Sequence, residues 1–178
     1  MAGLMAKINL IARCAGMYRD EKFSGLDLGS GQQIYLFAVC REPGISQEQI
    51  ARQICVNKSN VTRSLSQLEA AGYVVRRQSE SDKRITRVYP TERALEILPT
   101  VRTICRDWSR SITVDLSDEE RRLLDELLER MVVRARSYAD NGNFEGSSCE
   151  GLPSEEGFPN DDPPRISQNG SAGKEAGQ

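Results

Sequence analysis

The stretch SQEQIARQICVNKSNVTRSLSQLEAAGYVVRR, residues 46–77, carries the signals that decide the fold. Ser46 precedes a glutamine by three residues, at Gln49, which is the spacing of a capping box at a helix start. Asn57 can cap a second helix, because an asparagine side chain accepts a hydrogen bond from a free N–H of the first turn. Two short helices separated by the tight turn 55–57 form the pattern of a helix-turn-helix.

The second of these helices has an apolar face and a polar face. Val61, Leu65 and Leu68 follow the three-and-four spacing that places them on one side, so we expect them in the core. Gly72, just beyond the helix, suits the left-handed backbone of a helix end. The opposite face carries no acid before Glu69. Its residues are Lys58, Ser59, Asn60, Thr62, Arg63, Ser66 and Gln67.

This polar face has the chemistry of a helix that reads DNA. Asparagine, glutamine and arginine can bond base edges in the major groove, whereas lysine, serine and threonine hold phosphates. The capped helix start adds a partial positive charge on the side that DNA would approach. A merely solvated face in an all-α protein is the alternative. The DNA contacts predicted on this helix are Lys58, Ser59, Asn60, Thr62, Arg63 and Gln67.

After Gly72 the pattern becomes that of a β-hairpin. The runs 73–77 and 85–89 are rich in strand-forming residues, and a polar segment separates them. Lys83 or Arg84 at the projecting tip can enter the minor groove or hold the DNA backbone, so both are predicted DNA contacts. We expect Asp82 to pair locally and to orient Arg84. A plain charged turn is the alternative.

Longer helices are predicted on both sides of this unit. Apolar spacing indicates one helix over about 2–23 and a deeply buried helix over about 32–42. Two further helices are predicted over about 91–112 and 117–140, the last of them opened by a capping box at Ser117. The apolar stripes of the terminal helices have no partner within the winged unit. A two-fold related copy of the chain would bury them.

The predicted fold class is therefore mainly α with a small β-hairpin wing, a winged helix-turn-helix with N- and C-terminal dimerisation helices. We expect one domain over residues 1–140, with its DNA-binding part at about 32–90. The dimerisation helices are expected at about 2–23 and 91–140. Residues 141–178 are rich in Gly, Ser, Pro, Asn and acids, which predicts a disordered acidic tail.

Charge is unevenly distributed along the chain. The formal net charge of −2 argues against a nucleic-acid partner when it is taken alone. Between residues 51 and 90, however, eight basic residues face three acidic ones, whereas residues 141–178 hold seven acids and two bases. Because the local balance decides what binds DNA, the basic middle region supports a nucleic-acid partner.

Several classes of function are disfavoured by composition. The chain has no histidine, which removes His-ligated metal sites, His-based catalytic triads and the commonest general base. We therefore expect no enzymatic activity, no metal and no cofactor. No stretch approaches the roughly 20 apolar residues that cross a bilayer, so we expect no membrane partner and a cytoplasmic location. Four of the five cysteines lie in apolar helical patterns, which predicts buried free thiols.

Residues 25–139 resemble the MarR family of winged helix-turn-helix regulators. The resemblance rests on Gly31-Gln32, on PGISQEQIA at 43–51 and on VNKSNVTRSLSQLEAAGYVVRR at 56–77. It continues in SDKRITRVYPT at 81–91 and in LSDEERRLLDELLERM at 116–131. The D-x-R motif of Asp82 and Arg84 is its most specific part. The segment 90–94 departs from the usual L-T-E-K-G of the family.

The resemblance implies a homodimer whose first and last helices intertwine and which binds a pseudo-palindromic site on double-stranded DNA. It also implies control by a small-molecule effector or by cysteine oxidation. Tyr18, Phe37 and Trp108 are candidate walls of an effector pocket, with ordinary core packing as the alternative. Cys14 is the candidate redox sensor, because it precedes Tyr18 by four residues as in peroxide-sensing members; an inert buried thiol is the alternative.

The function predicted from these observations is a sequence-specific DNA-binding transcriptional regulator, a repressor relieved by a small-molecule ligand. Two alternatives stay open. One is a winged-helix module that binds other proteins, with the acidic tail as a candidate contact. The other is a regulator that senses redox state through a cysteine.

Overall fold

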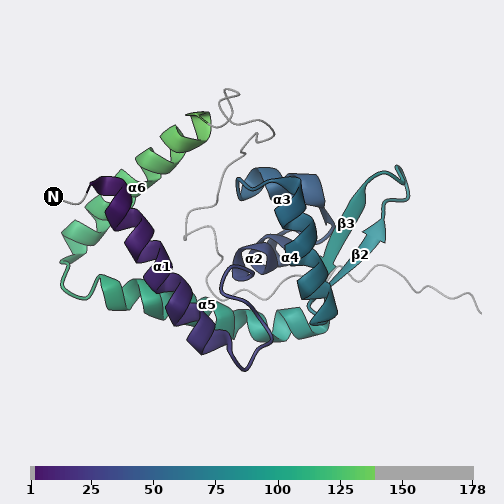
Figure 1. The fold of residues 1–178 in the computed structure, drawn as a ribbon, viewed down its shortest axis with the longest axis horizontal. Coiled ribbons are helices and arrows are strands. Elements are labelled where there is room, and N and C mark those ends of the chain that lie inside the picture. Colours follow the sequence, from purple (N-terminus) through teal and green to yellow (C-terminus); the bar gives the residue numbers. More distant parts are fainter. Residues whose placement is uncertain (1–2, 139–178) are drawn as a thin grey trace, which may run out of the picture.

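The computed structural model describes residues 3–138. Six helices and three short strands make up this part of the chain (Figure 1). The predicted fold class, mainly α with a small β-hairpin wing, is confirmed. The elements are α1 (Leu4–Phe23), α2 (Gln33–Arg41), β1 (Ile45–Ser46), α3 (Gln47–Gln53), α4 (Lys58–Ala70), β2 (Val74–Gln78), β3 (Thr86–Pro90), α5 (Glu92–Ile112) and α6 (Asp118–Tyr138).

Side-chain caps fix the starts of α3 and α4 where the sequence predicts them. The Ser46 hydroxyl accepts from the Gln49 N–H at 3.1 Å, and the Gln49 amide oxygen accepts from the Ser46 N–H at 3.0 Å. The Asn57 side chain accepts from the Asn60 N–H at 2.9 Å. Between the helices Cys55 adopts a positive φ of 52°, which reverses the chain within the tight turn.

The core lies where α2, α4, the sheet and the first half of α5 meet. Val61, Leu65 and Leu68 of α4 are fully buried, as their spacing predicts. They share one apolar cluster with Leu36 of α2 and Val101 of α5. Fully burying a side chain of this kind contributes about 1.5–3 kcal/mol, so the cluster holds α4 firmly with its polar face outward.

The sheet has three antiparallel strands in the order β1-β3-β2. The hairpin strands lie one residue later than predicted, at 74–78 and 86–90. Strand β1 is missed by the sequence reading, because two residues show no periodicity. Its Ile45 pairs with Val88 of β3. Gly44 precedes it with φ +89°, and a Cβ there would lie 3.1 Å from the Tyr89 ring, so the turn requires glycine.

The segment that departs from the family pattern, 90–94, joins the end of β3 to the start of α5. Thr91 caps the helix by accepting from the Ala94 N–H at 3.2 Å, and its hydroxyl donates to the Gly72 carbonyl at 2.7 Å. Ala94 is fully buried. Arg93 donates to the Ala71 carbonyl at 2.6 Å, so this junction joins the end of α4 to α5.

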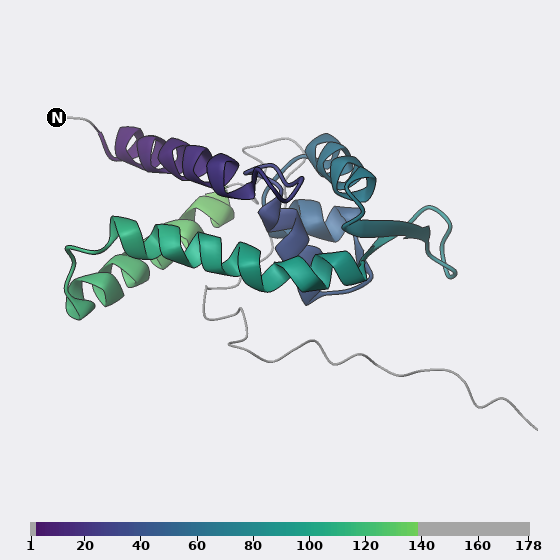
Figure 2. The same cartoon turned by 90° about the horizontal axis from the view of Figure 1, so that it is seen from below.

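Helix α1 and the second half of α5 extend away from the winged part of the molecule (Figures 1 and 2). The end of α6 returns toward it, since Arg136 donates to the Gln53 carbonyl of α3 at 3.5 Å. α1 contacts α5, yet only Ala15 and Phe23 of α1 are buried. No residue of α6 is buried. Its predicted apolar stripe is exposed in the single chain. Leu124, Leu127, Leu128 and Met131 keep between 38% and 43% of their surface exposed.

The cysteine prediction needs correction. Cys40 is buried, and burial raises the pKa of its thiol to about 11. Cys14 is exposed, and Cys105 is half-buried. Cys55 is exposed and disulfide-bonded, so it is not the buried free thiol that we predicted. Cys149 and the predicted acidic tail 141–178 lie outside the described residues.

Candidate nucleic-acid interface

The polar face of α4 lies on the surface, as predicted. All six DNA contacts predicted on this helix are exposed, because the buried stripe fixes the rotation of α4. Lys58 and Arg63 form no ion pair within residues 3–138. The Ser59 hydroxyl donates to Asn57 at 2.8 Å, and the Thr62 hydroxyl donates to the Lys58 carbonyl at 3.0 Å. The face therefore combines two unpaired cations with hydroxyl and amide groups.

The single acid of α4 is neutralised by a partner on β2. Arg76 donates to the Glu69 carboxylate from its backbone N–H at 3.1 Å and from Nε at 2.9 Å. A third contact, from Nη2, measures 2.5 Å. Hydrogen bonding to the Arg76 side chain lowers the pKa of Glu69, which favours its charged form. The ion pair also ties the end of α4 to the wing.

The wing tip carries the two predicted cations, Lys83 and Arg84, and both are exposed. The Asp82 carboxylate accepts from the backbone N–H of Arg84 at 2.9 Å. Asp82 thus pairs locally as predicted, although it fixes the Arg84 backbone, and no ion pair joins the two side chains in the described part. At the base of the wing, Arg87 donates to the Gly44 carbonyl at 2.8 Å. This contact ties the wing to the turn before β1.

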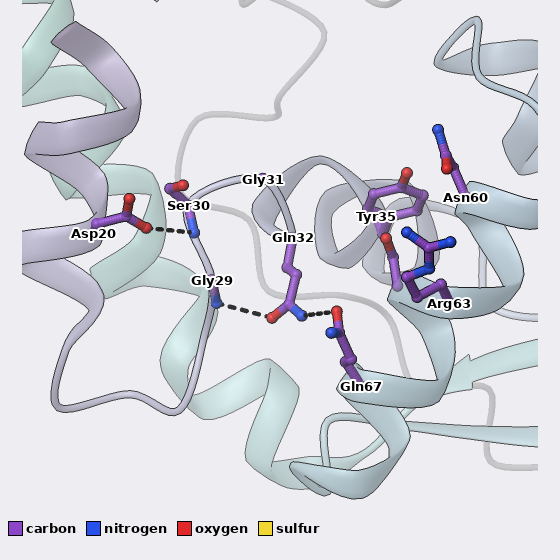
Figure 3. A pocket seen from close by; sticks show the side chains of 10 residues that line it. Asp20, Gly29, Ser30, Gly31, Gln32, Tyr35, Asn60, Arg63 and Gln67 are labelled. Atoms are coloured by element: carbon purple, nitrogen blue, oxygen red, sulfur yellow. Dashed lines mark hydrogen bonds between the residues drawn. The ribbon is translucent and has the colours of Figure 1, made fainter. Parts of the chain in front are cut away.

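Gln67 differs from the other predicted contacts because its side chain is bonded to the loop before α2. The Gln32 side-chain amide donates to Gln67 Oε1 at 2.7 Å, and Gln32 Oε1 accepts from the Gly29 N–H at 2.8 Å (Figure 3). The Ser30 N–H donates to Asp20 of α1 at 3.2 Å. A chain of contacts therefore links α1, the loop before α2, and α4.

These contacts border an open cleft of about 500 Å³ beside α4. Its walls are the loop 29–32, Tyr35 of α2 and the loop-facing side of α4 at Asn60, Arg63 and Gln67 (Figure 3). Sequence reasoning missed this cleft, since the Gln32–Gln67 pair joins residues 35 positions apart. The Gly31-Gln32 motif was the one signal that marked the loop.

The candidate effector residues are only partly brought together. The rings of Tyr18 on α1 and Trp108 on α5 lie with centroids 5.4 Å apart at a tilt of 38°. Lys22 lies 5.7 Å from the centroid of the Tyr18 ring. Phe37 is half-buried on α2 against the core. The effector roles of these residues and the redox role of Cys14 stay predictions.

The described residues offer neither a metal-binding cluster nor a membrane-spanning helix. Within residues 3–138, no three His, Cys, Asp or Glu side chains lie close enough together to hold a metal ion. In the same part of the chain, every helix is too short or too polar to span a bilayer.

The fold and this surface define a winged helix-turn-helix protein: a capped, outward-facing helix α4 beside a cationic β-hairpin. The model of the MarR family matches residues 32–86, which hold α2 to the wing tip. The chain is 32% identical over 149 residues to YybA of Bacillus subtilis (strain 168), an uncharacterised HTH-type transcriptional regulator, covering 80% of this chain and 97% of YybA. The chain belongs to the MarR family of transcriptional regulators.

Solved structures agree with this placement. The crystal structure of the transcriptional regulator SlyA superposes with a TM-score of 0.72 at 31% identity, covering 75% of this chain and 94% of SlyA. A MarR family regulator from Listeria monocytogenes, crystallised with a 26mer DNA, superposes with a TM-score of 0.73 at 23% identity. That match covers 82% of this chain and 99% of the Listeria protein, and it shows the shared fold.

Proposed function

We propose that this regulator acts in the cytoplasm as a homodimer that reads a pseudo-palindromic operator with α4 and its wing, and that it represses transcription until a small-molecule ligand releases it. The observation that carries the proposal is the exposed face of α4. Its first two turns hold the cations Lys58 and Arg63, which form no ion pair with any residue of the described range 3–138, and its one acid, Glu69, is bound to Arg76. DNA is the partner crystallised with the Listeria regulator of the same fold.

Base reading is assigned to the middle of α4 and backbone contacts to its start and to the wing. Arg63 can bond a guanine edge with two N–H groups, and Asn60 can bond adenine. Lys58 and Ser59, at the positive end of the helix, face phosphates. Lys83 and Arg84 at the wing tip suit the minor groove or the neighbouring backbone.

A second copy of the chain supplies the symmetry. The exposed leucines of α6 and the apolar side chains of α1, such as Leu10 and Ile11, are too numerous for a face meant for water. Their burial in a two-fold interface would hold two α4 helices about one DNA turn apart. The Tyr18–Trp108 contact lies on α1 and α5, which belong to this terminal region. A ligand wedged there could change the spacing of the two α4 helices and release the operator.

The test is selection of genomic fragments bound by the purified protein, followed by footprinting of the recovered site. We expect an inverted repeat that is bound more weakly as salt rises, because phosphate contacts release counterions. Arg63→Ala should weaken operator binding by about 5- to 150-fold, which corresponds to 1–3 kcal/mol. Arg13→Ala, an exposed arginine of α1, is the matched control and should leave binding unchanged. Equal losses in both variants would refute the assignment of α4.

A further inference from the structure

The tight turn between α3 and α4 carries an oxidised cysteine. Cys55 is exposed and disulfide-bonded. The chain has five cysteines, and the other three that the structure describes, Cys14, Cys40 and Cys105, are reduced thiols. The turn itself does not call for a cysteine, because its φ of 52° is a conformation that glycine adopts at lower cost. Within this chain, only Cys149 is left as the partner of Cys55.

The end of α6 brings the following segment of the chain to this turn. Arg136 donates to the Gln53 carbonyl of α3 at 3.5 Å. Gln53 precedes Cys55 by two residues, and Arg136 precedes Cys149 by thirteen. Because thirteen extended residues span up to roughly 45 Å, Cys149 is within reach of Cys55 from the place where α6 ends.

The residues that follow Cys149 are strongly acidic. Residues 150–162 hold five acids and no base. These acids are Glu150, Glu155, Glu156, Asp161 and Asp162. The opposite charge lies close to Cys55, on Lys58 and Arg63 of α4, which form no ion pair with any residue of the described range 3–138. Thirteen residues are long enough to run along all of α4, since a helix of this length measures about 20 Å.

We propose that a disulfide between Cys55 and Cys149 holds the acidic segment 150–162 across the cationic face of α4, where the segment competes with DNA. The bond places the first of the acids near Lys58, at the positive end of the helix dipole. Because the segment is tethered, its effective concentration at α4 is high, and its carboxylates need only weak intrinsic affinity. The inference rests on the proposed function in one respect, since the covered face is the one that we propose to read DNA.

The tether closes and opens by thiol–disulfide exchange. The thiolate of one cysteine attacks a disulfide oxidant such as glutathione disulfide, which forms a mixed disulfide and releases one glutathione thiolate. The thiolate of the other cysteine attacks the protein sulfur of the mixed disulfide and releases the second glutathione. The two protein thiols thus lose two protons and two electrons, and the oxidant becomes two glutathione molecules. A reducing cytoplasm reverses the exchange and uncovers α4.

The first arm of the test identifies the disulfide in the full chain. Each cysteine lies on a different tryptic peptide, with Cys55 in 53–58 and Cys149 in 137–165. We expect mass spectrometry to show these two peptides linked after treatment with glutathione disulfide and separate after treatment with dithiothreitol. The protein should keep the mass of one chain on a non-reducing gel. No linkage, linkage to another cysteine, or a bond between two chains would overturn the inference.

The second arm measures binding of the selected operator by the oxidised and the reduced chain. We expect oxidation to raise the dissociation constant about 10-fold, which corresponds to one open chain in ten. Cys149→Ser should bind like the reduced wild type under both conditions. Cys14→Ser, which removes an exposed thiol of α1, is the matched control and should keep the full effect of oxidation. A linked wild type that binds the operator as tightly as the reduced one contradicts the proposal.

The third arm separates the charges from the tether. A variant with Gln or Asn in place of the five acids of 150–162 should keep the linked peptides and bind the operator when oxidised as tightly as the reduced wild type. Glu145→Gln combined with Glu175→Gln removes two acids outside the segment and should leave the effect of oxidation in place. Weak binding that persists in the oxidised chain without the five charges would overturn the role given to them.

A last readout needs no DNA. In the oxidised wild type, Lys58 should react more slowly with an acylating reagent than in the reduced protein. Lys7, an exposed lysine of α1, should react equally in both states. Failure to recover any bound DNA would refute the proposed function, and the reactivity of Lys58 would still decide whether the segment covers α4. Equal reactivity of Lys58 in the two states would show that it does not.

Discussion

Helices α4 and α6 carry the same kind of leucine stripe and differ in what covers it. In α4, Leu65 and Leu68 follow the three-and-four spacing and are fully buried by α2, the sheet and α5. In α6, Leu124 and Leu127 follow the same spacing, yet 39% and 43% of their surfaces remain exposed. A stripe therefore predicts that a face will be covered, but it does not say whether the same chain covers it.

The difference divides the molecule into a winged part whose apolar stripe is buried within the chain and terminal helices whose apolar stripe is exposed, which we propose a second copy covers. The winged part fills its core from its own residues, so its polar face has one fixed direction. The terminal helices leave apolar area in water, which costs about 25 cal/mol for each Å² that a partner could bury. The account of function needs both parts, because one α4 reads only half of a two-fold site.

The largest effect is expected where the core is complete. Leu65→Ala removes a fully buried side chain and leaves a cavity, so it should lower the free energy of unfolding by about 2–5 kcal/mol. Chemical denaturation followed by circular dichroism measures this. Leu123→Ala is the control, because Leu123 is 54% exposed on α6, outside the predicted stripe. Equal losses of unfolding free energy in Leu65→Ala and Leu123→Ala would contradict the distinction between the winged part and α6.

The second-largest effect is expected on the association of two chains into the proposed dimer. Leu127→Glu places a charge in the face that we propose a second copy covers, so the dissociation constant of the dimer should rise at least about 100-fold. Sedimentation at several concentrations measures it. Arg130→Glu, an exposed charge reversal on the same helix, serves as the control and should weaken the dimer far less. A Leu127→Glu protein that still dimerises like the wild type would contradict the proposed interface.

The two capping boxes allow a matched comparison of smaller size. Ser46 caps α3 in the winged part, and Ser117 accepts from the Glu120 N–H at 3.2 Å to cap α6. Alanine at either site should cost about 0.5–2 kcal/mol. We expect the loss in Ser46→Ala at every protein concentration. The loss in Ser117→Ala should appear in the dimer stability instead, as a melting temperature that depends on concentration. If the melting temperatures of Ser46→Ala and Ser117→Ala depended on protein concentration to the same extent, the division between the winged part and the terminal helices would be contradicted.

The smallest effect concerns the ion pair between α4 and the wing. Arg76 lowers the pKa of Glu69, so this pair stabilises the fold above the ordinary pKa of glutamate. The contribution is lost as the pH falls through the lowered pKa. Wild type should exceed Glu69→Gln in unfolding free energy by up to about 1 kcal/mol near neutral pH, because the pair is partly exposed. This difference in unfolding free energy should disappear in acid, where Glu69 is protonated. A difference that stays constant with pH would contradict the stabilising role of the Glu69–Arg76 pair.

The sequence predicts the local features of the winged part closely. The caps at Ser46 and Asn57, the buried face of α4 and the hairpin all follow from spacing of a few residues. Strand β1 was missed, because two residues carry no pattern and its pairing with Val88 is a tertiary contact. The buried thiols predicted at Cys14 and Cys55 were wrong, because helical spacing cannot say which faces another element will cover.

The candidate site likewise has features that local spacing predicts and features that depend on tertiary contacts. Which residues of α4 face outward could be read from the buried stripe alone. The pairing of Gln67 with Gln32 could not, since it depends on how the loop before α2 folds over α4. The cleft is likewise a product of tertiary packing, and the Gly31-Gln32 motif marks only its loop.

The mass of the complex formed with the selected operator tests the central claim most directly, because it counts the α4 helices on the DNA. Sedimentation of the wild type with a duplex carrying both half-sites should show two chains on each duplex, with much weaker binding to a duplex that carries one half-site. A single chain bound with full affinity to either duplex would contradict the account.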